Sequence, residues 1–241
     1  MNNKYKVLVF DLDDTLIDEG VSIDYALRAV YKELNLPYGD NALAEWRQID
    51  EAFWDDYRFD KIDIPVGYQN DGVVNGRMRR HFLRASRFLR LFDNMTLDQA
   101  YEISDIYEDN MVIEIATMSN VAETLEYLYS RYILVIATDG VHEIAEKKLS
   151  ATGLAKYFRE IYSPLRVGTV KPKPDFFDPI FAEFGDNKSQ YLLIGNSITS
   201  DVQLANNVGI DSCLVFDDNL KKSGNISTLV VKELAKLQEI L

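Results

Sequence analysis

The stretch "KVLVFDLDDTL", residues 6 to 16, decides the fold, because an apolar run passes directly into three aspartates within four positions. An unbroken apolar run is typical of a strand buried on both faces of a parallel sheet. Asp11, Asp13 and Asp14 follow at once, and like charges packed that closely repel one another. Either the stretch is an acidic, solvated turn, or a positive group lies there when the protein works.

Three further apolar runs have the same character. They are "YILVIA" at 132–137, "YLLIG" at 191–195 and "DSCLVF" at 211–216. Helical patterns lie between the later runs, and one of them starts at Asn120 with Glu123 three residues on, which predicts a capping box. Strands that alternate with helices predict an α/β fold, here a Rossmann-like parallel sheet flanked by helices.

The segment 19–115 has a different character, because aromatic and charged residues recur there at helical spacing without a strand-like run. We expect four amphipathic helices, "SIDYALRAVYKEL", "NALAEWRQIDEAFWDDYRF", "GRMRRHFLRASRFLRLF" and "LDQAYEISDIYEDNMV". The predicted domains are therefore an α/β core of residues 1–18 and 116–241 and a helical-bundle insertion of residues 19–115.

The third of these helices carries six arginines. One interpretation is a solvated helix face whose arginines pair with acidic neighbours. The alternative is that Arg77, Arg79 or Arg80 binds an anionic or hydroxylated part of a ligand.

Composition excludes several classes of protein. The chain has 241 residues, a net charge of -13 and one cysteine, Cys213. The acidic balance argues against nucleic acid and membrane surfaces as partners, since both attract basic patches. A single cysteine excludes an intrachain disulfide and a cysteine-based zinc cluster. The N-terminus lacks the long apolar segment of a secretory signal, so we expect a cytoplasmic protein. We also expect a monomer or a homodimer.

Polar residues follow the apolar runs at the points where ligands bind to open parallel sheets. They are Asp11 and Asp13 after the first run, Thr138, Asp139 and Gly140 after the second, and Gly195, Asn196, Ser197 and Asp201 after the third. Three carboxylates and an amide, from Asp11, Asp13, Asp201 and Asn196, offer the oxygen ligands that Mg²⁺ prefers. A bound Mg²⁺ would relieve the repulsion among the aspartates.

A lysine and a helix start complete the predicted site. Lys171 lies in "VKPKPDFF", and its ammonium can neutralise a carboxylate and a phosphate together. Thr138, with the backbone N–H groups of Asp139 and Gly140 at a helix start, could bind a phosphate group. The expected ligand is a small-molecule phosphate ester.

These motifs, in this order, resemble the haloacid dehalogenase (HAD) superfamily in its phosphatase branch. The matching stretches are "DLDDT", "ATDG", "KPKPDFF" and "GNSITSD", and the insertion at 19–115 stands where members with a helical cap carry it. The resemblance implies that Asp11 attacks phosphorus to form an aspartyl-phosphate, and that Asp13 protonates the leaving oxygen and later activates water. It also implies that Lys171 holds the nucleophile and the phosphate. Mg²⁺ would be bound by Asp11, the backbone carbonyl of Asp13 and the "GNSITSD" loop.

Two positions depart from the common pattern of the family. Asp139 replaces the usual asparagine and could add negative charge near the phosphate. Asn196 replaces the usual aspartate, which should weaken Mg²⁺ binding.

The predicted function is a magnesium-dependent phosphatase that hydrolyses a small phosphomonoester through an aspartyl-phosphate. The candidate substrates are a nucleoside 5'-monophosphate, since the helical insertion resembles the nucleoside 5'-monophosphatase-like branch, and a sugar phosphate. The alternatives are a phosphomutase of the same fold and a degenerate member that binds a phospholigand for regulation.

Overall fold

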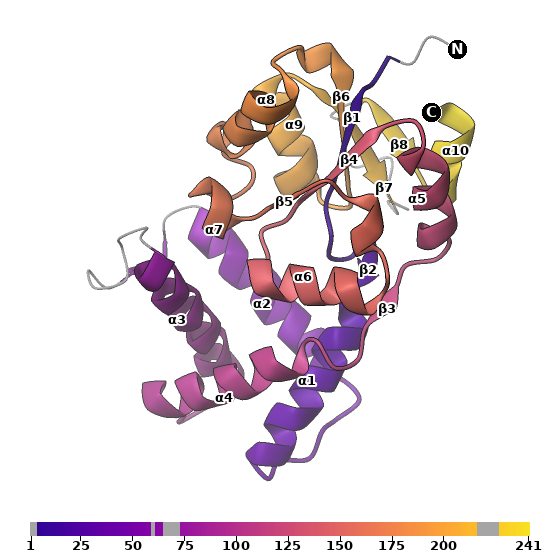
Figure 1. The fold of residues 1–241 in the computed structure, drawn as a ribbon. Helices are drawn as coiled ribbons and strands as arrows, with labels where there is room; N and C mark the ends of the chain where they lie inside the picture. The colour runs from indigo at the N-terminus through magenta and orange to yellow at the C-terminus, as the bar shows by residue number, and fades with distance from the viewer. Residues whose placement is uncertain (1–3, 59–60, 65–72, 216–226) are drawn as a thin grey trace. The chain divides into compact units, whose positions relative to one another are not determined.

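The computed structural model describes residues 4–58, 61–64, 73–215 and 227–241, except for the side chains of residues 58 and 73–79. The chain forms two compact units (Figure 1). One comprises Met1–Glu19 with Ile115–Leu241, and the other comprises Gly20–Glu114. The boundaries expected from the sequence, at 18/19 and 115/116, lie one residue from these.

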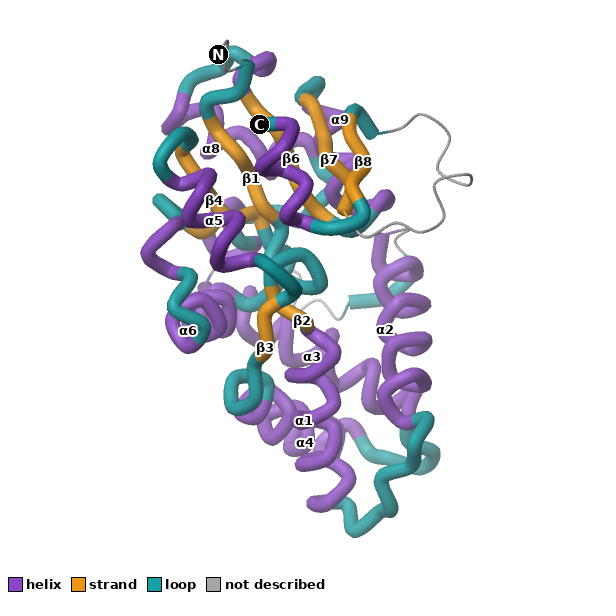
Figure 2. Tube along the Cα trace, turned by 90° about the vertical axis from the view of Figure 1, so that its right-hand side faces the viewer, coloured by secondary structure: helices purple, strands orange, loops and turns teal. Residues whose placement is uncertain are grey.

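The first unit is built on a parallel sheet (Figures 1 and 2). Among the described residues it has six strands in the order β5-β4-β1-β6-β7-β8. They are β1 (Val7–Phe10), β4 (Ile133–Ala137), β5 (Ile161–Tyr162), β6 (Tyr191–Gly195), β7 (Asp211–Val215) and β8 (Leu229–Val231), and each adjacent pair is parallel. The four predicted strands and the α/β class are confirmed, and β1 lies between β4 and β6.

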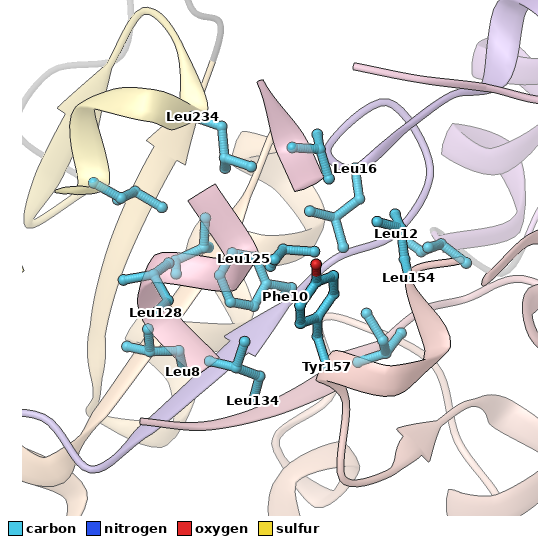
Figure 3. Close-up of a cluster of buried hydrophobic side chains, with 14 of the residues drawn as sticks. Leu8, Phe10, Leu12, Leu16, Leu125, Leu128, Leu134, Leu154, Tyr157 and Leu234 are labelled. Atoms are coloured by element: carbon cyan, nitrogen blue, oxygen red, sulfur yellow. The ribbon is translucent and has the colours of Figure 1, made fainter. Parts of the chain in front are cut away.

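Helices cover both faces of this sheet. They are α5 (Val121–Tyr129), α6 (His142–Ala151), α7 (Pro164–Val167), α8 (Asp178–Phe184), α9 (Gln203–Val208) and α10 (Leu237–Ile240). Leu8 and Phe10 of β1 face a cluster that contains Leu125 and Leu128 of α5 (Figure 3). Val9 of β1 belongs to the opposite cluster, with residues of α8 and α9. Because side chains alternate along a strand, β1 is buried on both faces.

The predicted capping box at Asn120 is wrong. The residue adopts a left-handed backbone, with φ 60°, and its side chain makes no capping hydrogen bond to α5. A capping box needs an extended backbone at the N-cap, and Asn120 instead uses the left-handed conformation that asparagine tolerates. The structure has a capping box elsewhere, between Thr96 and Gln99 at the start of α4.

The second unit contains the four predicted helices. They are α1 (Glu19–Glu33), α2 (Ala42–Arg58), α3 (Val73–Leu91) and α4 (Leu97–Asn110). The core of this unit is aromatic: the ring centroid of Trp46 lies 4.6 Å from that of Phe88 and 5.1 Å from that of Tyr107. A short antiparallel pair, β2 (Ile17–Asp18) with β3 (Ala116–Thr117), stands next to the two chain crossings between the units.

Three arginines of α3 whose side chains are described, Arg84, Arg87 and Arg90, pair with carboxylates, as one interpretation expected, but Arg84 and Arg87 are not solvated. Arg84 binds Glu108 and Arg87 binds Asp50, and the arginine side chains are only 10% and 11% exposed. The side chains of Arg77 and Arg79 lie outside the described residues, so the alternative for this helix stays a prediction.

Within the described part of the chain, no helix combines the length and the apolar character needed to cross a membrane. The cytoplasmic location stays a prediction.

Candidate active site

Asp11 stands at the carboxyl end of the central strand β1. Its backbone N–H donates to the carbonyl of Ile194 on β6 at 2.9 Å, so the parallel ladder extends one residue beyond the strand. The residue is 7% exposed. This position gives Asp11 a fixed backbone, which a side chain on a free loop would lack.

Lys171 bridges two carboxylates. Its Nζ lies 2.7 Å from Oδ1 of Asp11 and 2.7 Å from Oδ1 of Asp201, and all three residues are buried. Burial by itself would lower the pKa of Lys171, but the two carboxylates raise it above its ordinary value, so the ammonium stays charged. One positive charge between two negative charges leaves this group with a deficit of positive charge.

Burial and the charges of Lys171 and Asp201 change the acidity of Asp11. Burial raises the pKa of the Asp11 carboxyl to about 7; the charge of Lys171 opposes this rise and that of Asp201 adds to it. A further cation near Asp11 would favour the ionised carboxylate.

Asp201 packs against a glycine that admits no side chain. A Cβ atom added at Gly195 would lie 2.2 Å from Oδ2 of Asp201, which is well inside van der Waals contact. Oδ2 also accepts a hydrogen bond from the backbone N–H of Ser197 at 3.1 Å. Asp201 lies in a single π-helical turn, Ile198–Val202, that precedes α9. The first and last residues of "GNSITSD", Gly195 and Asp201, therefore pack directly against each other.

The hydroxyl of Thr15 links Asn196 to Asp11. The Thr15 hydroxyl lies 3.1 Å from Oδ2 of Asp11 and 3.3 Å from Oδ1 of Asn196, and Thr15 is fully buried. The amide oxygen of Asn196 is therefore directed to the side of Asp11 that Lys171 does not occupy. The sequence prediction did not include Thr15, although its place four residues after Asp11 in an acidic turn was a usable signal.

Asp13 points to a different lysine. Oδ1 of Asp13 lies 2.6 Å from Nζ of Lys148 on α6, and Oε1 of Glu19 lies 3.7 Å from the same nitrogen. The Lys148 side chain is 1% exposed. Burial alone would lower the pKa of Lys148, but Asp13 and Glu19 raise it. The sequence prediction missed Lys148. It could have been found because it is a charged residue on the helix face that also carries the apolar residues Ala145 and Leu149.

The predicted metal-binding role of the Asp13 side chain, together with those of Asp11 and Asp201, stays a prediction. Among the described residues, no group of three or more histidine, cysteine, aspartate or glutamate side chains could hold a metal ion. The reason is that the Asp13 carboxylate is turned to Lys148. The remaining donors are the carboxylates of Asp11 and Asp201 and the amide oxygen of Asn196, together with the backbone carbonyl of Asp13. An all-oxygen set of this kind fits Mg²⁺, which keeps several water ligands.

The "ATDG" loop lies beside Asp13. A Cβ atom at Gly140 would lie 3.1 Å from Oγ1 of Thr138 and 3.4 Å from Oδ2 of Asp13, so these three residues are neighbours. The backbone N–H of Gly140 donates to Thr138 at 2.9 Å, and α6 begins at His142. The phosphate-binding role predicted for Thr138 and for the backbone N–H groups of Asp139 and Gly140 stays a prediction.

Asp139 ties two motifs together. Its Oδ1 accepts a hydrogen bond from the backbone N–H of Lys171 at 2.9 Å. The carboxylate that departs from the family pattern thus holds the loop that carries Lys171, and its charge helps to raise the Lys171 pKa.

Comparisons with known proteins agree with this geometry. A family model described as haloacid dehalogenase-like hydrolase matches residues 5–209. The chain is 31% identical to the pyrimidine 5'-nucleotidase PynA of Streptococcus pneumoniae, over 86% of this chain and 82% of PynA. It is 26% identical to YfnB of Bacillus subtilis, which is named as a HAD hydrolase, over 98% of this chain and 94% of YfnB. The crystal structure of YfnB bound to magnesium has a TM-score of 0.82 at 23% identity and covers 98% of each chain.

The chain therefore belongs to the haloacid dehalogenase-like hydrolase family, and the resemblance carried by its four motifs is confirmed. It is an enzyme of the hydrolase class with the fold of that family.

Proposed function

We propose that the protein is a magnesium-dependent phosphatase that hydrolyses a small phosphomonoester through an aspartyl-phosphate. The observation that supports this most directly is the buried group in which Lys171 lies 2.7 Å from both Asp11 and Asp201. This group combines a fixed carboxylate nucleophile, a charged lysine and a deficit of positive charge.

In the first step, an Asp11 carboxylate oxygen forms a bond to phosphorus while the bond from phosphorus to the ester oxygen breaks. Asp13 gives its proton to the departing oxygen, so the product leaves as a neutral alcohol. Lys171 holds the Asp11 carboxylate and neutralises charge on the phosphoryl oxygens.

In the second step, water attacks the phosphorus of the aspartyl-phosphate. Asp13, now ionised, accepts the proton from that water, and the bond between Asp11 and phosphorus breaks to release inorganic phosphate. Thr138, next to Asp13, would donate its hydroxyl hydrogen to a phosphoryl oxygen, with Gly140 allowing close approach at that side.

Magnesium would be held by the side chains of Asp11, Asp201 and Asn196 and by the backbone carbonyl of Asp13. When bound, it supplies the positive charge that the group lacks and so lets the anionic ester approach the Asp11 carboxylate.

For the substrate we propose a nucleoside 5'-monophosphate, because the 31% identical relative PynA is named as a pyrimidine 5'-nucleotidase. A sugar phosphate is the second candidate, because another relative, 27% identical over 51% of this chain, is named as a glyceraldehyde 3-phosphate phosphatase, and glyceraldehyde 3-phosphate is a triose phosphate.

The test is release of inorganic phosphate from p-nitrophenyl phosphate and from uridine 5'-monophosphate, in MgCl₂ and in EDTA. We expect turnover by the wild type in MgCl₂ only and none by Asp11→Asn. Turnover by Asp11→Asn would refute the nucleophile. Transfer of the phosphoryl group between two positions of a sugar phosphate, without net release, would identify a phosphomutase, and binding without turnover would identify a regulatory member.

A further inference from the structure

The buried Lys148 has no place in the mechanism above, although it makes the shortest contact to Asp13. We propose that Lys148 is a positioning residue that holds the Asp13 carboxylate in the orientation needed for proton transfer. This inference rests on the proposed function, because it concerns the proton that Asp13 gives to the leaving oxygen.

The geometry assigns different tasks to the two oxygens of Asp13. Oδ1 lies 2.6 Å from the Lys148 ammonium, whereas Oδ2 lies on the side of Thr138 and Gly140. A carboxylate held at one oxygen loses rotational freedom about its χ angles, and the other oxygen is then presented in one direction. Oδ2 is therefore the oxygen that exchanges the proton.

A purely structural role explains Lys148 poorly. It shares a face of α6 with Ala145 and Leu149, which are 2% and 1% exposed. An apolar side chain of similar length would fill this place without the desolvation that a buried ammonium requires. The charge of Lys148 is instead compensated by two carboxylates, and one of them is that of Asp13.

Glu19 holds the lysine from the other side. Its carboxylate lies 3.7 Å from Nζ of Lys148, and its backbone N–H donates to Oδ1 of Asp14 at 3.1 Å. With two acidic partners, the Lys148 ammonium is held in one place. It therefore restricts the orientation of the Asp13 carboxylate.

The test compares two esters whose leaving groups differ in their need for a proton. The p-nitrophenolate ion leaves without protonation, whereas the alcohol of β-glycerol phosphate requires it. Because kcat/KM reports the steps up to departure of the leaving group, it isolates the proton donation by Asp13.

We expect Lys148→Met to lower kcat/KM for β-glycerol phosphate by about 10- to 100-fold and for p-nitrophenyl phosphate by less than about 3-fold. Asp13→Asn should show the same selectivity more strongly, and Lys148→Arg should recover part of the activity toward the alkyl ester. The matched control is Lys147→Met, which changes the exposed neighbour on the same helix and should alter neither value.

Equal losses for both esters in Lys148→Met would overturn the proposal, as would no loss for either. If Lys148→Met does not fold by circular dichroism, Glu19→Gln takes its place and should show the same selectivity with a smaller amplitude. An unselective Glu19→Gln would then count against the proposal. Failure of the proposed function is distinguishable, because it would appear as activity that survives Asp11→Asn or as no selective loss in Asp13→Asn.

Discussion

The two units bury their cations in different surroundings. In the α/β unit, Lys171 and Lys148 each meet two carboxylates. In the helical unit, Arg84 and Arg87 each have a strong ion pair with one carboxylate and also lie against aromatic rings.

The number of charged partners separates two roles. A one-to-one pair next to aromatic rings is balanced in charge, and its arginine adds packing and cation–π attraction to the fold. A lysine between two carboxylates leaves net negative charge in a buried place, which opposes folding unless a further cation arrives. We therefore expect changes in the α/β groups to act on chemistry and changes in the helical unit to act on stability.

The largest effect is expected from Lys171→Met. The change leaves Asp11 and Asp201 facing each other without the ammonium, so the phosphoryl group loses the positive charge that lies beside the nucleophile. We expect kcat to fall by about 10³-fold or more, measured as phosphate release from p-nitrophenyl phosphate. The control is Lys173→Met, two residues on and exposed, which should keep full activity. A loss below about 10-fold in Lys171→Met would contradict the role of this lysine in charge neutralisation.

The next effect concerns the glycine under Asp201. Gly195→Ala places a Cβ atom where Oδ2 of Asp201 lies, at 2.2 Å, so the carboxylate must move away from Lys171. We expect kcat to fall by about 10²-fold and the MgCl₂ concentration for half-maximal activity to rise. Gly39→Ala is the matched change in the helical unit, because an added Cβ meets nothing within 4 Å there. Unaltered activity in Gly195→Ala would show that Asp201 can shift without consequence.

Acidity gives a third test of the charge deficit. The pKa of Asp11 rises on folding from 3.8 to about 7, so the stability that Asp11 contributes is fully present below about pH 4 and is lost as the pH rises through about 7. In EDTA, Asp11→Asn should therefore melt at a higher temperature than the wild type at pH 8, with a smaller difference at pH 4. Thermal unfolding followed by circular dichroism measures this difference. A lower melting temperature for Asp11→Asn than for the wild type at pH 8 would contradict a destabilising charge on Asp11.

A change in the helical unit should give the opposite pattern. Arg87→Leu removes the partner of Asp50 and a guanidinium whose carbon lies 5.3 Å from the ring centroid of Trp54. We expect a loss of about 1–3 kcal/mol in the free energy of unfolding, because Asp50 is partly exposed and can be solvated. Hydrolysis of p-nitrophenyl phosphate below the melting temperature should be nearly unchanged. An Arg87→Leu enzyme that is stable but inactive would break the distinction between the two units.

The sequence predicted most of the fold because long apolar runs and helical periodicity are local signals. β1, β4, β6 and β7 each have four or five residues, and their runs stood out. β5 has only two residues, Ile161–Tyr162, and forms by pairing with β4. A two-residue strand carries no period, so only the tertiary structure reveals it.

The site was predictable for residues that lie in recognisable motifs and unpredictable for contacts made by residues outside them or by unexpected partners. Asp11, Lys171 and Asp201 could be proposed from the ends of strands and from the resemblance. The contact from Lys148 to Asp13 joins residues 135 positions apart, and the hydrogen bond from the Lys171 backbone to Asp139 spans 32. No local pattern encodes such pairs, which is why the contact between the Asp13 carboxylate and Lys148 was not predicted.

The smallest expected effect concerns Asn196, which tests whether the charge deficit at Lys171 limits the enzyme. The amide oxygen already faces Thr15 and, through it, Asp11, so Asn196→Asp changes charge with little change in shape. An added carboxylate should bind Mg²⁺ more strongly and lower the concentration for half-maximal activity by about 3- to 10-fold. Because it also adds repulsion when no metal is bound, the variant should melt at a lower temperature than the wild type in EDTA and at an equal or higher one in MgCl₂. Identical magnesium dependence in the two proteins would place Asn196 outside the metal site and leave Asp11 and Asp201 as the side chains that hold Mg²⁺.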